Sequence, residues 1–97
     1  MLEISNLINE LQILEIDCDI YLFGSYLKSS KWADLDFLIV YRTYEDIKKL
    51  KEVFSRHFQH TPLDLNFMTQ EEEGYFNFIS QTNAQQIFPK ISRNIKT

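Results

Sequence analysis

The sequence predicts a small α+β domain, in which a mixed or antiparallel sheet of three or slightly more strands has helices packed on one face. Two observations lead to this fold class. Some segments carry apolar residues with a helical period, and others alternate apolar and polar residues or are apolar throughout. These segments follow one another as helix, strand, strand, helix, strand, helix, and 97 residues suit one domain with one core. No repeat or composition shift divides the chain, so we expect residues 1–97 to be a single domain.

The first half of the chain predicts one helix and two strands. Apolar residues three and four positions apart indicate a helix over about residues 3–16. The residues of this stripe are Ile4, Leu7, Ile8, Leu11 and Leu14. A short buried strand is predicted over residues 20–23, and Gly24 ends it. A second strand over residues 35–41 is rich in β-forming residues and has one interior charge, Asp36.

The next two elements are a helix and a third strand. Thr43 and Asp46 are spaced as in a capping box, which predicts a helix over about residues 44–58. Strict alternation then predicts a strand over residues 63–68, with the apolar Leu63, Leu65 and Phe67 on one face. A helix between two strands permits a parallel or an antiparallel pair, and the sequence does not choose between them.

The last predicted element is a helix that ends before Pro89. Thr69 and Glu72 form a second capping-box pattern at its start. The apolar residues assigned to this helix are Phe76, Ile79 and Ile87. Residues 90–97 are expected to form a loose tail.

Composition and charge exclude several classes of protein. The chain is 44% hydrophobic with only two Gly and two Pro, which excludes disorder as its main state. Its longest apolar run, Phe37–Tyr41, is far shorter than the roughly 18 residues of a membrane helix. A net charge of −4 argues against long nucleic acid as a partner. The single cysteine and the absence of a secretory signal pattern make the cytoplasm the expected location.

Three aspartates stand in apolar surroundings on predicted strands. Asp34 and Asp36 are two apart, so their side chains point to the same face, and Asp64 joins them if the strands are neighbours. Any one of them is more simply a solvated residue at a strand end. Together they lack alternating Lys or Arg partners, and burying such charges is costly. Carboxylate oxygens are the ligands that Mg²⁺ prefers, so the three predict a magnesium site with room for two ions.

A phosphate-binding turn is predicted beside these acids. Gly24 and Ser25 directly follow a buried strand, where backbone N–H groups and a hydroxyl are free to hold phosphate oxygens. Lys28 and Lys31 lie in the following loop and are candidates to reach a triphosphate, although a loop lysine is more often simply solvated.

The order and spacing of three motifs resemble the minimal nucleotidyltransferases of the DNA polymerase beta superfamily. The motifs are Leu22–Ser25, Asp34–Leu38 and Leu63–Leu65, and the resemblance covers about residues 20–68. It implies a polymerase-beta-like nucleotidyltransferase fold and the transfer of a nucleoside monophosphate, AMP from ATP first of all, to a hydroxyl with release of pyrophosphate.

The resemblance also implies a role for each motif residue. Gly24 and Ser25 would hold the nucleotide phosphates, and Asp34 and Asp36 would bind two Mg²⁺ ions. Asp64 would complete the second metal site and help to activate the acceptor hydroxyl.

The resemblance further implies a partner. Small stand-alone members resemble the antitoxin halves of toxin–antitoxin modules, whose toxins are helical HEPN-type ribonucleases. The chain lacks the additional helical domain of larger members, so such a toxin or a second copy is expected to supply that surface. The alternative is a binding module with this fold that neutralises a partner by contact, with little or no turnover. A purely structural domain is disfavoured, because it leaves the three aspartates unexplained.

Overall fold

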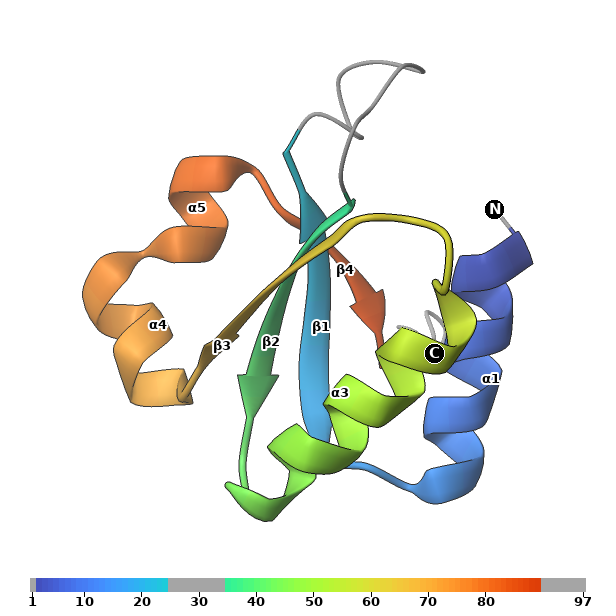
Figure 1. The fold of residues 1–97 in the computed structure, drawn as a ribbon. Coiled ribbons are helices and arrows are strands. Elements are labelled where there is room, and N and C mark those ends of the chain that lie inside the picture. The colour runs from blue at the N-terminus through green and yellow to red at the C-terminus, as the bar shows by residue number, and fades with distance from the viewer. Residues whose placement is uncertain (1, 25–34, 90–97) are drawn as a thin grey trace, which may run out of the picture.

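The protein is an α+β structure whose elements alternate along the chain (Figure 1). The computed structural model describes residues 2–24 and 35–89. Its elements are α1 (Leu2–Leu14), β1 (Cys18–Phe23), β2 (Leu35–Tyr41), α3 (Glu45–His57), β3 (Leu63–Met68), α4 (Gln70–Phe76), α5 (Phe78–Thr82) and β4 (Gln85–Phe88). The predicted tail, residues 90–97, lies outside the described residues. No helix in the described ranges has the length and apolar character of a membrane span.

The strands form one mixed sheet with the order β3-β2-β1-β4. β1 is antiparallel to both β2 and β4, whereas β3 is parallel to β2. The predicted mixed sheet is therefore confirmed, and β4 adds a strand to the three that the sequence predicts. The parallel pairing is the choice that the sequence left open, and α3 is the crossover that makes it possible.

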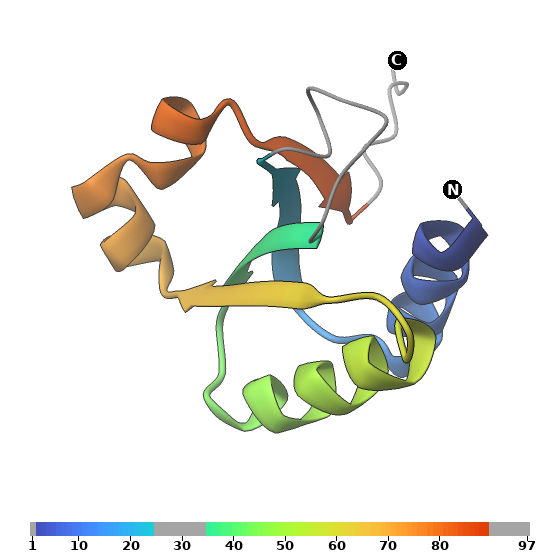
Figure 2. The ribbon, with the colours of Figure 1, turned by 45° about the horizontal axis from the view of Figure 1, so that its top comes forward.

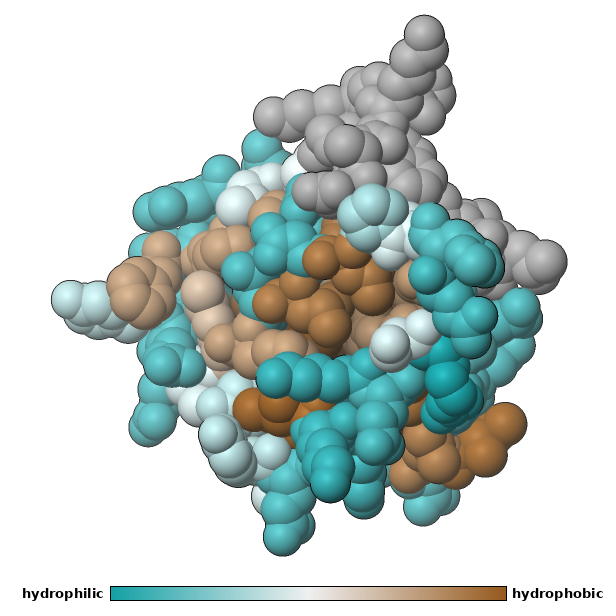
Figure 3. Space-filling view, in the orientation of Figure 1, coloured by the Kyte–Doolittle hydropathy of each residue, from teal (hydrophilic) through white to brown (hydrophobic). Residues whose placement is uncertain are grey.

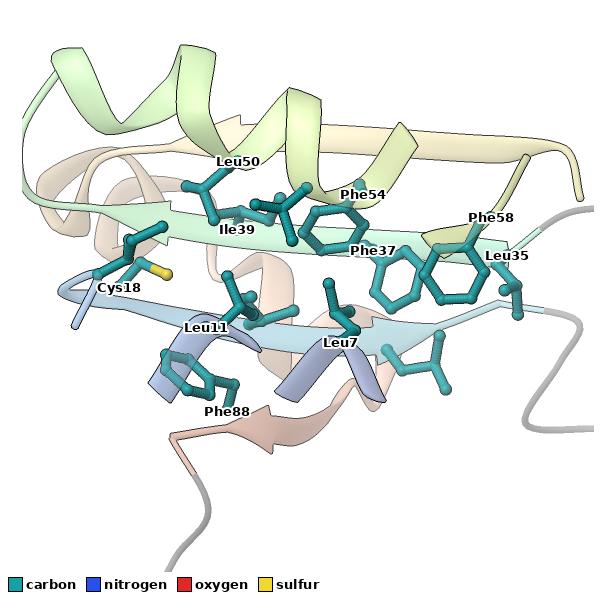
Figure 4. Packing of buried hydrophobic residues seen from close by; sticks show 14 residues of the cluster. Leu7, Leu11, Cys18, Leu35, Phe37, Ile39, Leu50, Phe54, Phe58 and Phe88 are labelled. Carbon is teal, nitrogen blue, oxygen red and sulfur yellow. The ribbon is translucent and has the colours of Figure 1, made fainter. Parts of the chain in front are cut away.

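One face of the sheet, the core face, carries the hydrophobic core under α1 and α3 (Figure 4). The fully buried side chains include Leu7 and Leu11 of α1, Phe37 and Ile39 of β2, and Phe54 of α3. The outer side of α3 is hydrophilic (Figure 3) and exposes three lysines. These residues are Lys48, Lys49 and Lys51. The apolar stripes of both long helices thus face the sheet because burial of that area stabilises the fold.

The opposite face, the second face, lies under the short helices α4 and α5 (Figure 2). Because side chains alternate along a strand, Leu38 and Val40 point away from the core face, yet they are 0% and 3% exposed. α4 contacts β2 and β3 on this side. Near the end of β1, Phe78 of α5 packs edge-on against Phe23, with ring centroids 4.9 Å apart. The long helices therefore lie on one face as predicted, and the C-terminal segment covers part of the other.

The prediction of one continuous helix from Thr69 to Pro89 is wrong. The Thr69–Glu72 capping box forms as predicted, but Asn77 and Asn83 adopt left-handed backbone conformations and end α4 and α5. Asparagine tolerates this conformation better than most residues, so both helices stop after one or two turns. The released chain then pairs with β1 as β4, which places Ile87 in a strand.

The predicted capping box at the start of α3 is also wrong. The N-cap is Tyr44, which makes no side-chain cap hydrogen bond. Thr43 Oγ1 instead donates to Asp46 Oδ2 at 2.9 Å, so the two side chains bond to each other rather than to the backbone. The helix starts nevertheless, because Glu45 and Asp46 place negative charge in its first turn.

An ion cluster links α1 to α3 at the edge of the core. Nη1 and Nη2 of Arg56 each donate to one carboxylate oxygen of Glu10, and His57 Nε2 lies 2.7 Å from Glu10 Oε1. These hydrogen bonds, with the one from Arg56 first, hold the pKa of Glu10 below its usual range. Because the pKa of Glu10 is lower in the folded state, its carboxylate stabilises the fold above the usual carboxyl pKa, and this stabilisation is lost as the pH falls to the lowered pKa. The Arg56 side chain is exposed and that of Glu10 is partly exposed, so solvent screens the pair and its contribution is small.

Cys18 is expected to resist alkylation in the native protein. Its side chain is 2% exposed, and burial raises the pKa of the thiol to about 12. Because the thiolate is the reactive form, iodoacetamide at pH 8 should modify Cys18 at least about 100-fold more slowly in the folded than in the urea-unfolded chain. Mass spectrometry of a labelling time course measures both rates. Equal rates would mean that the start of β1 opens readily.

Candidate functional site

Two of the predicted site residues lie side by side on the second face. Asp36 of β2 and Asp64 of β3 are register partners in the parallel pair. Neighbouring strands are about 4.8 Å apart, so the two carboxylates project from adjacent positions. Asp36 is partly buried and Asp64 is exposed. The parallel pairing therefore joins two acids that are far apart in the sequence.

An aromatic ring continues the line of the two acids. Phe23 of β1 is the antiparallel register partner of Asp36. Asp64, Asp36 and Phe23 thus form one row across three strands, at the end of the sheet where β1 ends and β2 and β3 begin (Figure 1). The row lies on the second face, away from the core under α1 and α3.

Gly24 follows Phe23 and lies directly against the Asp36 carboxylate. Its φ of +86° is a conformation that side chains disfavour. A Cβ on Gly24 would lie 2.1 Å from Oδ2 of Asp36, which is closer than any real contact. Only glycine fits here, because both the backbone conformation and the space beside Asp36 require it.

Gly24→Ala is expected to lower the free energy of unfolding by about 1–2 kcal/mol, because it combines a strained φ with displacement of Asp36. Gly74→Ala is the matched control, since nothing lies within 4 Å of its added Cβ and the residue is helical. That control should instead stabilise α4 by about 0.5–1 kcal/mol. Urea unfolding of both variants shows whether each substitution lowers or raises the free energy of unfolding. A Gly24→Ala protein as stable as the control would contradict the close contact with Asp36.

The remaining predicted site residues lie outside the described residues. These are Ser25, Lys28, Lys31 and Asp34. Within residues 2–24 and 35–89, no group of three or more His, Cys, Asp or Glu is placed to hold a metal ion. The described chain contributes the pair Asp36 and Asp64, whose carboxylate oxygens are suitable donors for Mg²⁺, beside a glycine whose missing side chain makes room for the Asp36 carboxylate.

Two further polar residues on the second face, Asn66 and Tyr21, have surroundings that favour a structural role over a catalytic one. Asn66 is two residues after Asp64, and its side-chain amide donates to the backbone carbonyl of Phe37 at 3.3 Å. Burial, together with the carboxylates of Asp19 and Glu73, raises the pKa of Tyr21. A phenol with a raised pKa stays protonated at neutral pH, so Tyr21 is unsuited to act as a base there.

Sequence reasoning missed the aromatic neighbours of the acids. Phe78 lies in the segment predicted as one helix, which the structure divides into α4 and α5. The pairing of Phe23 with Asp36 depends on the β1–β2 register, which the sequence does not reveal. The one usable signal was the place of Phe23 directly before Gly24.

Comparison with known protein families gives one match. The family model described as a nucleotidyltransferase domain matches residues 4–91, which is nearly the whole chain. No curated protein and no solved structure matches the sequence.

Proposed function

This chain belongs to the nucleotidyltransferase domain family, and from that premise we propose that it is an Mg²⁺-dependent enzyme that transfers AMP from ATP to a hydroxyl group. The observation that carries the proposal is the pairing of Asp36 with Asp64 next to Gly24. Two adjacent carboxylates concentrate negative charge at one place, which attracts a divalent cation. A divalent cation would offset it, and it would bring the triphosphate to the same place.

The positions of Gly24, Asp36 and Asp64 support their proposed roles. Asp36, together with Asp34 outside the described residues, would hold Mg²⁺ beside Gly24, and Gly24 and Ser25 are proposed to bind the phosphates. Bound Mg²⁺ neutralises charge on the phosphate oxygens. Asp64 is the more exposed of the paired acids, so it can orient the acceptor hydroxyl. Lys28 and Lys31 are proposed as further phosphate contacts.

The proposed reaction exchanges one bond at phosphorus for another. The acceptor oxygen bonds to the α-phosphorus, the bond from that phosphorus to the bridging oxygen breaks, and pyrophosphate leaves. The hydroxyl proton passes to the Asp64 carboxylate and then to water. The chain's contribution is positioning and charge stabilisation rather than covalent chemistry.

We assign the acceptor hydroxyl to a partner protein, with a helical HEPN-type toxin as the first candidate and an antitoxin role in the cytoplasm. Support comes from exposed aromatic surface: Tyr75 and Phe76 at the end of α4 are 82% and 53% exposed. Their rings pack edge-on with centroids 5.0 Å apart. Exposed aromatic pairs of this kind are typical anchors of protein interfaces.

The same observation favours the second candidate function, a binding module that neutralises its partner by contact. The two candidates differ in what the acids do. Inhibition by contact should survive loss of Asp34 and Asp36, whereas catalysis should not. Loss of Tyr75 and Phe76 should weaken both.

Label transfer tests the proposal. The protein is incubated with α-labelled ATP and Mg²⁺ in a lysate of its source cells, as wild type and as the Asp34→Ala/Asp36→Ala variant. A labelled band that requires both acids supports the enzyme and identifies its acceptor. If nothing is labelled and one partner co-purifies equally with both proteins, the binding module replaces the enzyme.

A further inference from the structure

Two aromatic rings stand at the end of the acidic row. Phe23 lies opposite Asp36, and Phe78 of α5 packs on Phe23 with ring planes 83° apart. Both rings are partly exposed. Phe23 and Phe78 form an apolar surface, the aromatic wall. This wall begins one strand away from the Asp36 carboxylate, on the same face of the sheet.

Local backbone conformation, a hydrogen bond and helix–sheet contacts fix the position of Phe78. Asn77, with φ of 53°, turns the chain between α4 and α5, so that Phe78 comes directly after the turn. The Glu73 carboxylate then accepts a hydrogen bond from the backbone N–H of Ile79 at 2.8 Å. Contacts of α4 with β2 and β3 anchor the preceding helix. Phe78 is thus positioned from both sides.

We propose that Phe23 and Phe78 form the binding surface for the base of the nucleotide, an inference that rests on the proposed function. The row places Phe23 about 5 Å from Asp36 and about 10 Å from Asp64. A nucleotide with its phosphates at Gly24 and Asp36 would reach the rings with its sugar and base. A planar base is the part of the substrate that gains from an aromatic wall.

The nature of the wall sets the specificity. Neither ring has a hydrogen-bonding atom, so binding depends on the area of the base rather than on its edge groups. Stacking tolerates every base because each has a π-face. ATP and GTP should therefore bind with similar affinity and more tightly than UTP, whereas inorganic tripolyphosphate should lose the contribution of the wall.

Binding of two ligands, MgATP and Mg²⁺-tripolyphosphate, separates this role from simple packing. Calorimetry of the full chain is done for wild type, Phe78→Leu, Phe78→Tyr and Tyr44→Ala. Phe78→Leu keeps an apolar side chain over Phe23, and it should weaken MgATP about 10-fold without changing tripolyphosphate binding. Phe78→Tyr should bind as wild type does. Tyr44→Ala, which removes a ring at 79% exposure from the start of α3, should change neither affinity.

Each outcome bears on a different proposal. If wild type binds tripolyphosphate and MgATP equally, or if Phe78→Leu binds MgATP as wild type does, the base surface is refuted and the proposed function stands. If wild type binds neither ligand, the proposed function fails and the base surface fails with it. If Phe78→Leu weakens both ligands equally, Phe78 only supports the fold of the site, and the inference is also overturned.

Discussion

Asp36→Asn is expected to lower the rate of nucleotidyl transfer about 100- to 1000-fold while the protein stays folded. Asparagine has the shape of aspartate, so it fits beside Gly24, but it cannot supply the negative charge that a divalent cation requires. The substitution also removes the repulsion between Asp36 and its register partner Asp64. The free energy of unfolding should therefore stay within about 1 kcal/mol of wild type. Initial rates of label transfer and urea unfolding measure the two quantities.

Asp17→Asn is the matched control for this substitution. It makes the same chemical change at an exposed position directly before β1, at the opposite end of that strand from Phe23 and the acids. Its transfer rate should equal that of wild type. Asp64→Asn should resemble Asp36→Asn, and the double variant should lose little more, since residues that act as a unit are not additive. Full activity of Asp36→Asn would remove the pair of acids from the mechanism.

Phe54→Ala is expected to lower the free energy of unfolding by about 3–5 kcal/mol, the largest stability effect of any change considered. Phe54 is 0% exposed and lies at the centre of the core under α3. Its ring centroid is 5.0 Å from that of Phe37 and 6.3 Å from that of Phe58. Alanine would leave a cavity between α3 and β2 and remove both aromatic contacts. A domain of this size is stable by about 5–15 kcal/mol in total, so this one change would remove a large share of its stability.

Thermal and urea unfolding measure this loss. Phe76→Ala is the control, because it deletes the same ring from an exposed position on α4 and should change stability by only about 0.5 kcal/mol. A loss below about 1 kcal/mol for Phe54→Ala would mean that the core collapses around the missing ring. In that case α3 would be held less rigidly on the sheet than the aromatic contacts suggest.

The elements that the sequence predicted well are those with a strong local pattern. The strands over residues 35–41 and 63–68 have their predicted bounds, and the two long helices differ only at their ends. Alternation and helical period act within a few residues, so one sequence reveals them. The segment after Thr69 has a weaker pattern, and there the two asparagines and the free edge of β1 decided the structure.

Some features of the candidate site are likewise visible in the sequence, whereas others depend on the fold. Acids among apolar residues and a glycine after a strand are visible in the chain, so the residues chemically suited to the site can be read from the sequence. That Asp64 lies beside Asp36, with Phe23 and Phe78 next to them, is seen only in the folded protein. Strand direction and register depend on burying α3 and β3 against the rest of the sheet. That burial is a property of the whole fold, and no local pattern encodes it.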